Sequence, residues 1–222
     1  MTKIRLCFLK TGPLRYIGHL DLLKVFQQTI RRAGLPMAYS QGFNPHMMLS
    51  FALPLPLGMA SCNDYADIIL EHEMPMSELI LKFNDHAPEG LCLKDAWKFE
   101  GHGAAALVSA GDYLLEIPSD KNKDDLNKSI QTLLTSEAIV IPKKTKSGVK
   151  DTDIRPDILH ISLEDSGILL RLAAGSGRFL NPLIVAKLIL GQDVSPSSII
   201  RHELYRQDNS KGLISLHEAP IF

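Results

Sequence analysis

The order in which strand-like and helix-like segments follow one another limits the folds open to this chain. Polar and apolar side chains alternate over residues 3–8, with Ile4, Leu6 and Phe8 on one side, which predicts a strand with one buried face. Over residues 20–33 the apolar side chains recur every three or four positions instead, which predicts an amphipathic helix. A strand followed at once by a helix is the first unit of the pattern that the rest of the chain repeats.

The predicted first helix has clear signals at both ends. Gly18 can serve as its N-cap, and Asp21 stands in the first turn, where a carboxylate favours the positive end of the helix dipole. Gly34 suits the position just past the helix, and Pro36 prevents its continuation. The side chains expected on the buried stripe are Leu20, Leu23, Phe26, Ile30 and Ala33.

The remaining segments predict an α+β fold made of two ferredoxin-like (βαββαβ) sandwich lobes with mainly antiparallel sheets. The small-residue stretch 101–106 is the best boundary, which gives lobes at 1–102 and 103–222. A single mixed sheet stays open as an alternative, because the halves share no clear residue-level repeat. Strands are expected at 35–39, 48–53, 65–70, 91–99, 113–117, 138–141, 158–163, 168–173 and 199–205, and further helices at 76–86, at 124–134 and from Pro182, with Asn181 as cap.

Charge is distributed unevenly along the chain. Residues 1–60 hold seven Lys or Arg and one acid, whereas residues 61–104 hold three basic and nine acidic side chains. A basic block of this size favours a polyanionic partner such as RNA. The alternative is that the basic and acidic blocks face each other inside one fold.

The sequence also predicts where the protein resides. No run of about 18 apolar residues is present, and the N-terminus lacks the layout of a signal peptide, so a cytoplasmic location and no membrane contact are expected. Cys7, Cys62 and Cys92 have no close spacing, which favours buried reduced thiols over disulfides or a CxxC metal site.

Two loops around the first helix hold most of the candidate site residues. In a ferredoxin-like lobe, segments 11–19 and 40–46 are expected to meet at one sheet edge, beside backbone amides that favour anions. The alternative is that these loop residues only shape turns. The residues expected there to bind RNA or another anion are Arg15, Tyr16, His19, Gln41, Asn44 and His46, joined by Arg31 and Arg32 on the helix.

Other candidates depend on weaker patterns. His19 and His46 are candidate acid and base groups, but no HxxxH or HExxH spacing supports a metal site, and no cofactor is predicted. The segment 174–178 precedes a helix and resembles an anion-binding turn that contains Arg178. A solvated hairpin or a phosphate-contacting arm would explain the basic stretch of Lys143, Lys144, Lys146, Lys150 and Arg155.

Three runs of the sequence carry a family resemblance: KTGPLRYIGHLDLLKVFQQTIRRAGLPMAYSQGFNPHMMLSFALPLPLG, DIRPDILHISLE and RLAAGSGRFLNPLIVAKLILG. Through them the chain resembles a bacterial radical-SAM-linked protein family over nearly its whole length. It implies a functional tie to a radical SAM protein and names no substrate. The chain departs from the family at Gly18, where Ser is usual, and at Met47-Met48, where Pro-Lys is usual, so one basic residue is lost beside the expected anion site.

Three functional hypotheses follow. The first is a non-catalytic adaptor that binds RNA through residues 1–60 and presents it to a radical SAM partner. The second is an RNA-processing or phosphoryl-handling enzyme that uses His19 and His46 as acid and base. The third is a domain that only binds another protein through its basic face.

Overall fold

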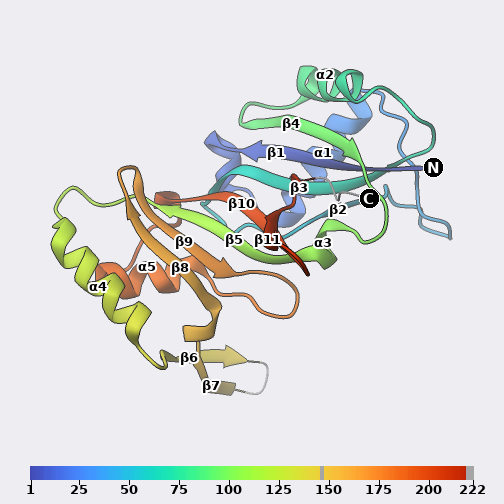
Figure 1. Cartoon of the computed structure of the whole chain (residues 1–222). Coiled ribbons are helices and arrows are strands. Elements are labelled where there is room, and N and C mark those ends of the chain that lie inside the picture. Colours follow the sequence, from blue (N-terminus) through green and yellow to red (C-terminus); the bar gives the residue numbers. More distant parts are fainter. Residues whose placement is uncertain (146–147, 219–222) are drawn as a thin grey trace.

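The computed structural model describes residues 1–145 and 148–218, and in them one nine-stranded sheet runs through both halves of the chain (Figure 1). The main path of the sheet is β4-β1-β3-β10-β5-β9-β8, with β2 beside β3 and β11 beside β10. The strands are β1 (Thr2–Lys10), β2 (Leu49–Phe51), β3 (Ala60–Leu70), β4 (Leu91–Lys98), β5 (Val108–Leu115), β8 (Ile158–Glu164), β9 (Gly167–Ala173), β10 (Ile199–Asp208) and β11 (Gly212–Ser215).

In the N-terminal half, two helices cover one face of the sheet. These are α1 (His19–Arg32), which follows a 3-10 turn at Gly12–Tyr16, and α2 (Met76–His86). Alternation along β1 directs Ile4, Leu6 and Phe8 toward the helices, where they share a core with Phe26 and Phe83. The side chains between them, Lys3, Arg5 and Cys7, therefore lie on the opposite face.

The C-terminal half repeats this arrangement with a hairpin inserted. Its helices are α4 (Lys123–Thr135) and α5 (Pro182–Leu190), which pack on β5, β8 and β9 around a second core. The inserted hairpin pairs β6 (Val140–Thr145) with β7 (Gly148–Asp153) as a separate sheet. Asn181 caps α5 by accepting from the Leu183 amide at 3.1 Å, which confirms the predicted start of this helix.

The two halves join through a short parallel pairing of β3 with β10, at Ala60 and Ser61. On the face opposite the four main helices, a third cluster gathers Cys7, Tyr65 and Leu204 around the short helix α3 (Ala104–Leu107). The predicted α+β class and mainly antiparallel pairing are confirmed. One continuous sheet, the alternative left open by the sequence, takes the place of two separate sheets.

Three local predictions need correction. Residues 35–39 form two isolated bridges, at Met37 and Tyr39, and no strand. Residues 104–106 of the predicted linker belong to the helix α3. Leu20 is 69% exposed, because at 3.6 residues per turn it lies about 120° around α1 from the buried Phe26, whereas Leu22 lies on the buried side.

Lys10, at the end of β1, is a buried cation. Lys10 is 1% exposed, and its ammonium group donates to the Ile17 carbonyl at 3.2 Å. Burial lowers the pKa of Lys10, an effect that the Asp64 carboxylate opposes and the Arg201 guanidinium reinforces. The unfolded chain therefore binds this proton more tightly than the folded chain does. Burial of the charged Lys10 lowers the free energy of unfolding at neutral pH, and this loss disappears as the pH rises toward the pKa of Lys10 in the unfolded chain.

We therefore expect Lys10→Met to raise the free energy of unfolding at pH 7 by about 1 kcal/mol or more. The gain should shrink as the pH approaches about 10.5, which urea unfolding at several pH values would measure. Lys24→Met, at an exposed lysine of α1, is the control and should change stability by less than about 0.5 kcal/mol. Equal stability of Lys10→Met and the original chain at every pH would contradict this prediction.

Candidate nucleic-acid interface

Arg15 in the first loop fastens that loop to the C-terminal half. Its Nε donates to the Gly58 carbonyl at 2.8 Å and its guanidinium also donates to the Ser197 carbonyl at 2.7 Å. The Gly58 amide donates back to the Arg15 carbonyl at 2.8 Å. Half-buried and held by two carbonyls, Arg15 is a structural contact, which leaves fewer of its donors for an anion than the sequence suggested.

Tyr16 and His19 in the same loop region reach solvent. The Tyr16 side chain is 62% exposed, and the Arg15 guanidinium lies 6.0 Å from its ring centre. The exposed His19 begins α1, and its ring meets the edge of Phe51 in β2 at 5.4 Å between centres. The first loop therefore offers one exposed aromatic face and one imidazole beside strand β2.

The second loop, residues 40–46, is closed on itself. The Ser40 amide donates to the His46 carbonyl at 2.9 Å, and the Ser40 hydroxyl lies 2.8 Å from His46 Nδ1 and accepts from the His46 amide at 3.1 Å. Residues 41–46 are all exposed, including the predicted contacts Gln41 and Asn44. Phe43 at the tip has the exposure of a fully solvated side chain (112%).

The two histidines contact different groups. The His19 ring at the start of α1 meets Phe51, whereas His46 Nδ1 lies 2.8 Å from the Ser40 hydroxyl within loop 40–46. In the described part of the chain, no hydrogen bond, ion pair or ring contact joins the two imidazoles. No group of three metal-ligating side chains is found among the described residues either.

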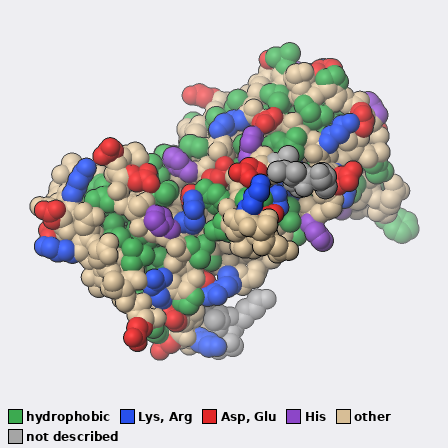
Figure 2. All heavy atoms as spheres, in the orientation of Figure 1, with side chains coloured by type: hydrophobic (Ala, Val, Ile, Leu, Met, Phe, Trp, Pro, Cys, Tyr) green, Lys and Arg blue, Asp and Glu red, His purple; other side chains and the backbone are tan. Residues whose placement is uncertain are grey.

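The basic block of residues 1–60 is only partly a surface feature. Arg5 and Lys10 are buried, and Arg5 pairs with Asp67 at 2.8 Å, as the alternative of facing charge blocks predicts. Lys24 is exposed and pairs with Asp21 at 3.2 Å. On the face drawn in Figure 2, Lys and Arg are interspersed with Asp and Glu. The exposed cations of this block that have no carboxylate partner in the described residues are Lys3, Arg31 and Arg32.

The two basic candidates Arg155 and Arg178 of the C-terminal half bind to groups within the protein. The Arg155 guanidinium donates to the carbonyls of Leu134 at 2.8 Å and Ile158 at 3.1 Å, and Arg178 pairs with Asp157 at 2.6 Å. Lys143 and Lys150 are exposed, whereas Lys146 and the side chain of Lys144 lie outside the described parts.

The glycine-rich turn before α5 has a structural explanation. A Cβ on Gly175 would stand 2.3 Å from the Val108 carbonyl oxygen, at a φ of +147° that suits glycine. The turn lines a cavity of about 330 Å³ with Lys143 and Arg178. Close packing on β5, without any ligand, accounts for glycine at position 175.

A polar cluster on the face of the sheet opposite the four main helices was not predicted. The Glu203 carboxylate accepts from the Tyr65 hydroxyl at 2.5 Å and from the Asn63 amide at 3.2 Å, and Lys94 donates to Asn63 at 2.5 Å. Burial raises the pKa of the neighbouring Cys7 thiol to about 12, and burial with the Glu203 carboxylate raises the pKa of Tyr65. Only the alternation along β1, which turns Cys7 away from the helices, could have indicated this cluster.

The prediction that the cysteines are buried holds for Cys7 but is wrong for Cys62 and Cys92. All three cysteines are free, although only Cys7 is buried and Cys62 and Cys92 are half-buried. Among the described residues, no helix has the length and apolar character needed to cross a membrane.

Comparison with known proteins identifies the family of the chain. A model of a family described as an uncharacterised protein conserved in bacteria, DUF2344, matches residues 3–182. A search of curated proteins found no match. Because the matched residues span most of the sequence and include both loops around α1, the chain belongs to the uncharacterised bacterial family DUF2344.

Proposed function

We propose that this protein is a non-catalytic adaptor that binds RNA and presents it to a radical SAM partner. The observation that carries the RNA-binding part is the exposure of Phe43 and Tyr16 in the two loops that flank α1. Aromatic faces in solvent stack unpaired bases, and each stacked base contributes about 1–3 kcal/mol. The partner is inferred from the resemblance of the chain to radical-SAM-linked proteins.

Lys3, Arg31 and Arg32 supply phosphate contacts in this proposal. For a single-stranded RNA that neutralises about three cations, the logarithm of the binding constant should fall with the logarithm of salt concentration at a slope of about −2. This shallow slope distinguishes a stacking interface from a surface that binds by charge alone. The enzymatic alternative has less support, because His19 and His46 contact different partners.

We expect Phe43→Ala to weaken binding of single-stranded RNA by roughly 5- to 150-fold, the equivalent of about 1–3 kcal/mol for one stacked base. Tyr16→Ala should act in the same direction. Fluorescence anisotropy with an end-labelled oligoribonucleotide measures both. Leu81→Ala is the control, because Leu81 is a comparably exposed apolar side chain (61%) on α2.

Two results would reject the adaptor proposal. If no salt-sensitive RNA binding is found at protein concentrations near micromolar, the RNA part is wrong. If a radical SAM protein co-purifies with the chain after nuclease treatment while RNA binding is absent, the chain is a protein-interaction domain instead.

We also infer that each half is a ferredoxin-like unit. Both halves run strand–helix–strand–strand–helix–strand, and their strand orders correspond, β4-β1-β3-β2 in the first and β10-β5-β9-β8 in the second. In such a unit the helices cover one face of the sheet and leave the other available to a ligand. In the N-terminal half that second face includes Lys3 and Arg5.

A further inference from the structure

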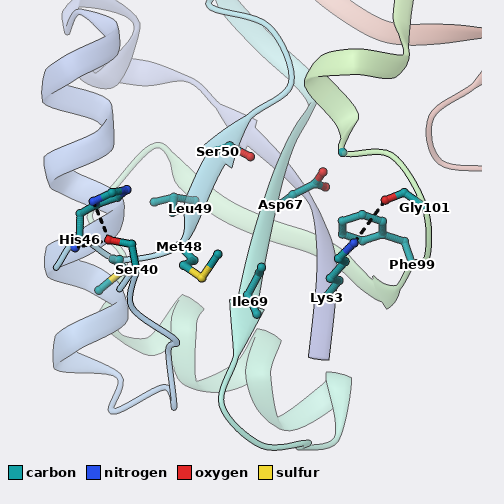
Figure 3. Close-up of a pocket in the computed structure, with 12 residues that line it drawn as sticks. Lys3, Ser40, His46, Met48, Leu49, Ser50, Asp67, Ile69, Phe99 and Gly101 are labelled. Carbon is teal, nitrogen blue, oxygen red and sulfur yellow. Dashed lines mark hydrogen bonds between the residues drawn. The ribbon is translucent and has the colours of Figure 1, made fainter. Parts of the chain in front are cut away.

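A cavity of about 300 Å³ lies on the face of the N-terminal sheet opposite α1 and α2 (Figure 3). Side chains from three adjacent strands line it: Lys3 of β1, Ser50 of β2, and Asp67 and Ile69 of β3. Loop 40–46 borders one side and residues 99–103 the other, so that segments far apart in the sequence border the same cavity. Its volume is at the lower end for small-molecule pockets.

An ion pair in the sheet supports Phe99, one of the apolar side chains of this cavity. Phe99 stacks on the Arg5 guanidinium, which lies 4.4 Å from the ring centre. Arg5 in turn donates to both oxygens of Asp67, at 2.8 and 3.2 Å, and the Ala104 amide donates to Asp67 at 2.5 Å. Arg5 therefore holds Phe99 in position and neutralises the Asp67 charge. Met48 and Ile69 line the same cavity.

The polar groups that remain around the cavity favour an anionic ligand with hydrogen-bonding edges. In the described residues, the Ser50 hydroxyl and Nε2 of His46 have no hydrogen-bond partner. The Lys3 ammonium donates to the Gly101 carbonyl at 3.3 Å and has no carboxylate partner among these residues. Apolar walls, free polar groups and one unpaired cation together suit a heteroaromatic ring that carries a phosphate.

We propose that this cavity binds the base of one nucleotide turned out of a single-stranded RNA, with a phosphate near Lys3. The inference rests on the proposed RNA-binding function and names the part of the RNA that enters the protein. Loop 40–46 connects the exposed ring of Phe43 with the cavity, because Phe43 lies at its tip while Ser40 and His46 line the cavity. RNA proteins commonly read unpaired bases by combining stacking with hydrogen bonds to the base edge.

Ser50→Phe tests the proposal, since an aromatic ring at this exposed position of β2 would occupy the cavity. Ser162→Phe on β8, the strand at the other end of the sheet, is the matched control. Each variant is titrated with an end-labelled oligoribonucleotide that contains one 2-aminopurine, and the fluorescence of the base and the anisotropy of the label are recorded. Ligand-detected NMR with the four nucleoside monophosphates forms a second arm. Lys3→Glu is a second variant should Ser50→Phe fail to fold.

We expect 2-aminopurine fluorescence to change on binding in the original chain and in Ser162→Phe. Ser50→Phe should lose this change and at least tenfold in affinity, and Lys3→Glu should lower affinity as well. If RNA binds without changing the fluorescence, and with the same affinity to Ser50→Phe as to the original chain, the pocket proposal is wrong. The adaptor proposal is not affected by that result. If the oligonucleotide does not bind, the adaptor proposal fails. The NMR experiment with nucleoside monophosphates then tests whether the cavity binds a nucleotide. Monophosphate binding that Ser50→Phe removes supports the pocket, and no binding overturns it.

Discussion

Asp64→Ala is expected to lower the free energy of unfolding by about 3–5 kcal/mol, because it leaves a buried guanidinium without its counter-ion. The side chains of Arg201 and Asp64 are 0% and 4% exposed, and Arg201 donates to both carboxylate oxygens at 2.7 Å. Arg201 also donates to the Leu53 carbonyl at 2.9 Å, but a carbonyl does not neutralise its charge. Loss of Asp64 would also remove the carboxylate whose charge opposes the effect of burial on Lys10.

The double variant Asp64→Leu/Arg201→Met is the control for Asp64→Ala. Removing both charges at once leaves no buried guanidinium without a counter-ion, and it also removes the Arg201 charge that repels the buried Lys10. This variant should therefore be markedly more stable than Asp64→Ala. Urea unfolding followed by circular dichroism measures all three proteins. If Asp64→Ala unfolds within about 1 kcal/mol of the original chain, the Arg201 charge is compensated by some other group and the prediction is wrong.

The position of this ion pair explains why its loss should affect the whole fold. Arg201 lies in β10 and Asp64 in β3, the two strands through which the halves of the sheet meet. The β-bridge between these strands is short, so the ion pair and the contacts of Arg15 with Gly58 and Ser197 supplement few backbone hydrogen bonds. We therefore expect Asp64→Ala to weaken the contact between the halves before it disturbs either helix layer.

Local signals were sufficient to predict the four main helices α1, α2, α4 and α5, but not the one-turn helix α3. The predicted bounds of α2 are those of the structure, and Gly18, Gly34 and Asn181 have the capping or turn positions expected of them. Such signals depend on residues within one or two turns, which the sequence displays directly. The outlying Leu20 shows the limit of the method, since three- and four-residue spacing alone does not locate the centre of the buried face.

Contacts between distant residues could not be predicted in the same way. Arg15 was expected to bind an anion, but its partners are carbonyls 43 and 182 positions away. The joining of the halves through β3 and β10 depends equally on residues that are remote in the chain. The sequence predicted one loop over residues 40–46. That this loop borders a cavity formed with Phe99 depends on how the strands pair, which the sequence does not show.

Phe26→Ala is expected to cost about 3–5 kcal/mol of unfolding free energy, because it opens a cavity in a cluster of aromatic rings. Phe26 is fully buried in α1, and its ring centre lies 4.9 Å from that of Phe8, 5.0 Å from Phe51 and 5.3 Å from Phe83. These neighbours belong to β1, β2 and α2, so one side chain connects three elements. Phe26→Leu keeps most of the buried volume and should cost less than Phe26→Ala.

Phe43→Ala is the matched control for Phe26→Ala, since both remove one phenyl ring but only Phe26 is buried. Phe43→Ala should change stability by less than about 0.5 kcal/mol while it weakens RNA binding, and Phe26→Ala should do the reverse at temperatures where it remains folded. Thermal unfolding and RNA titration on the same samples compare the two. A stability loss for Phe43→Ala equal to that of Phe26→Ala would mean that the Phe43 ring packs against the protein, and the exposed stacking face on which RNA binding depends would not exist.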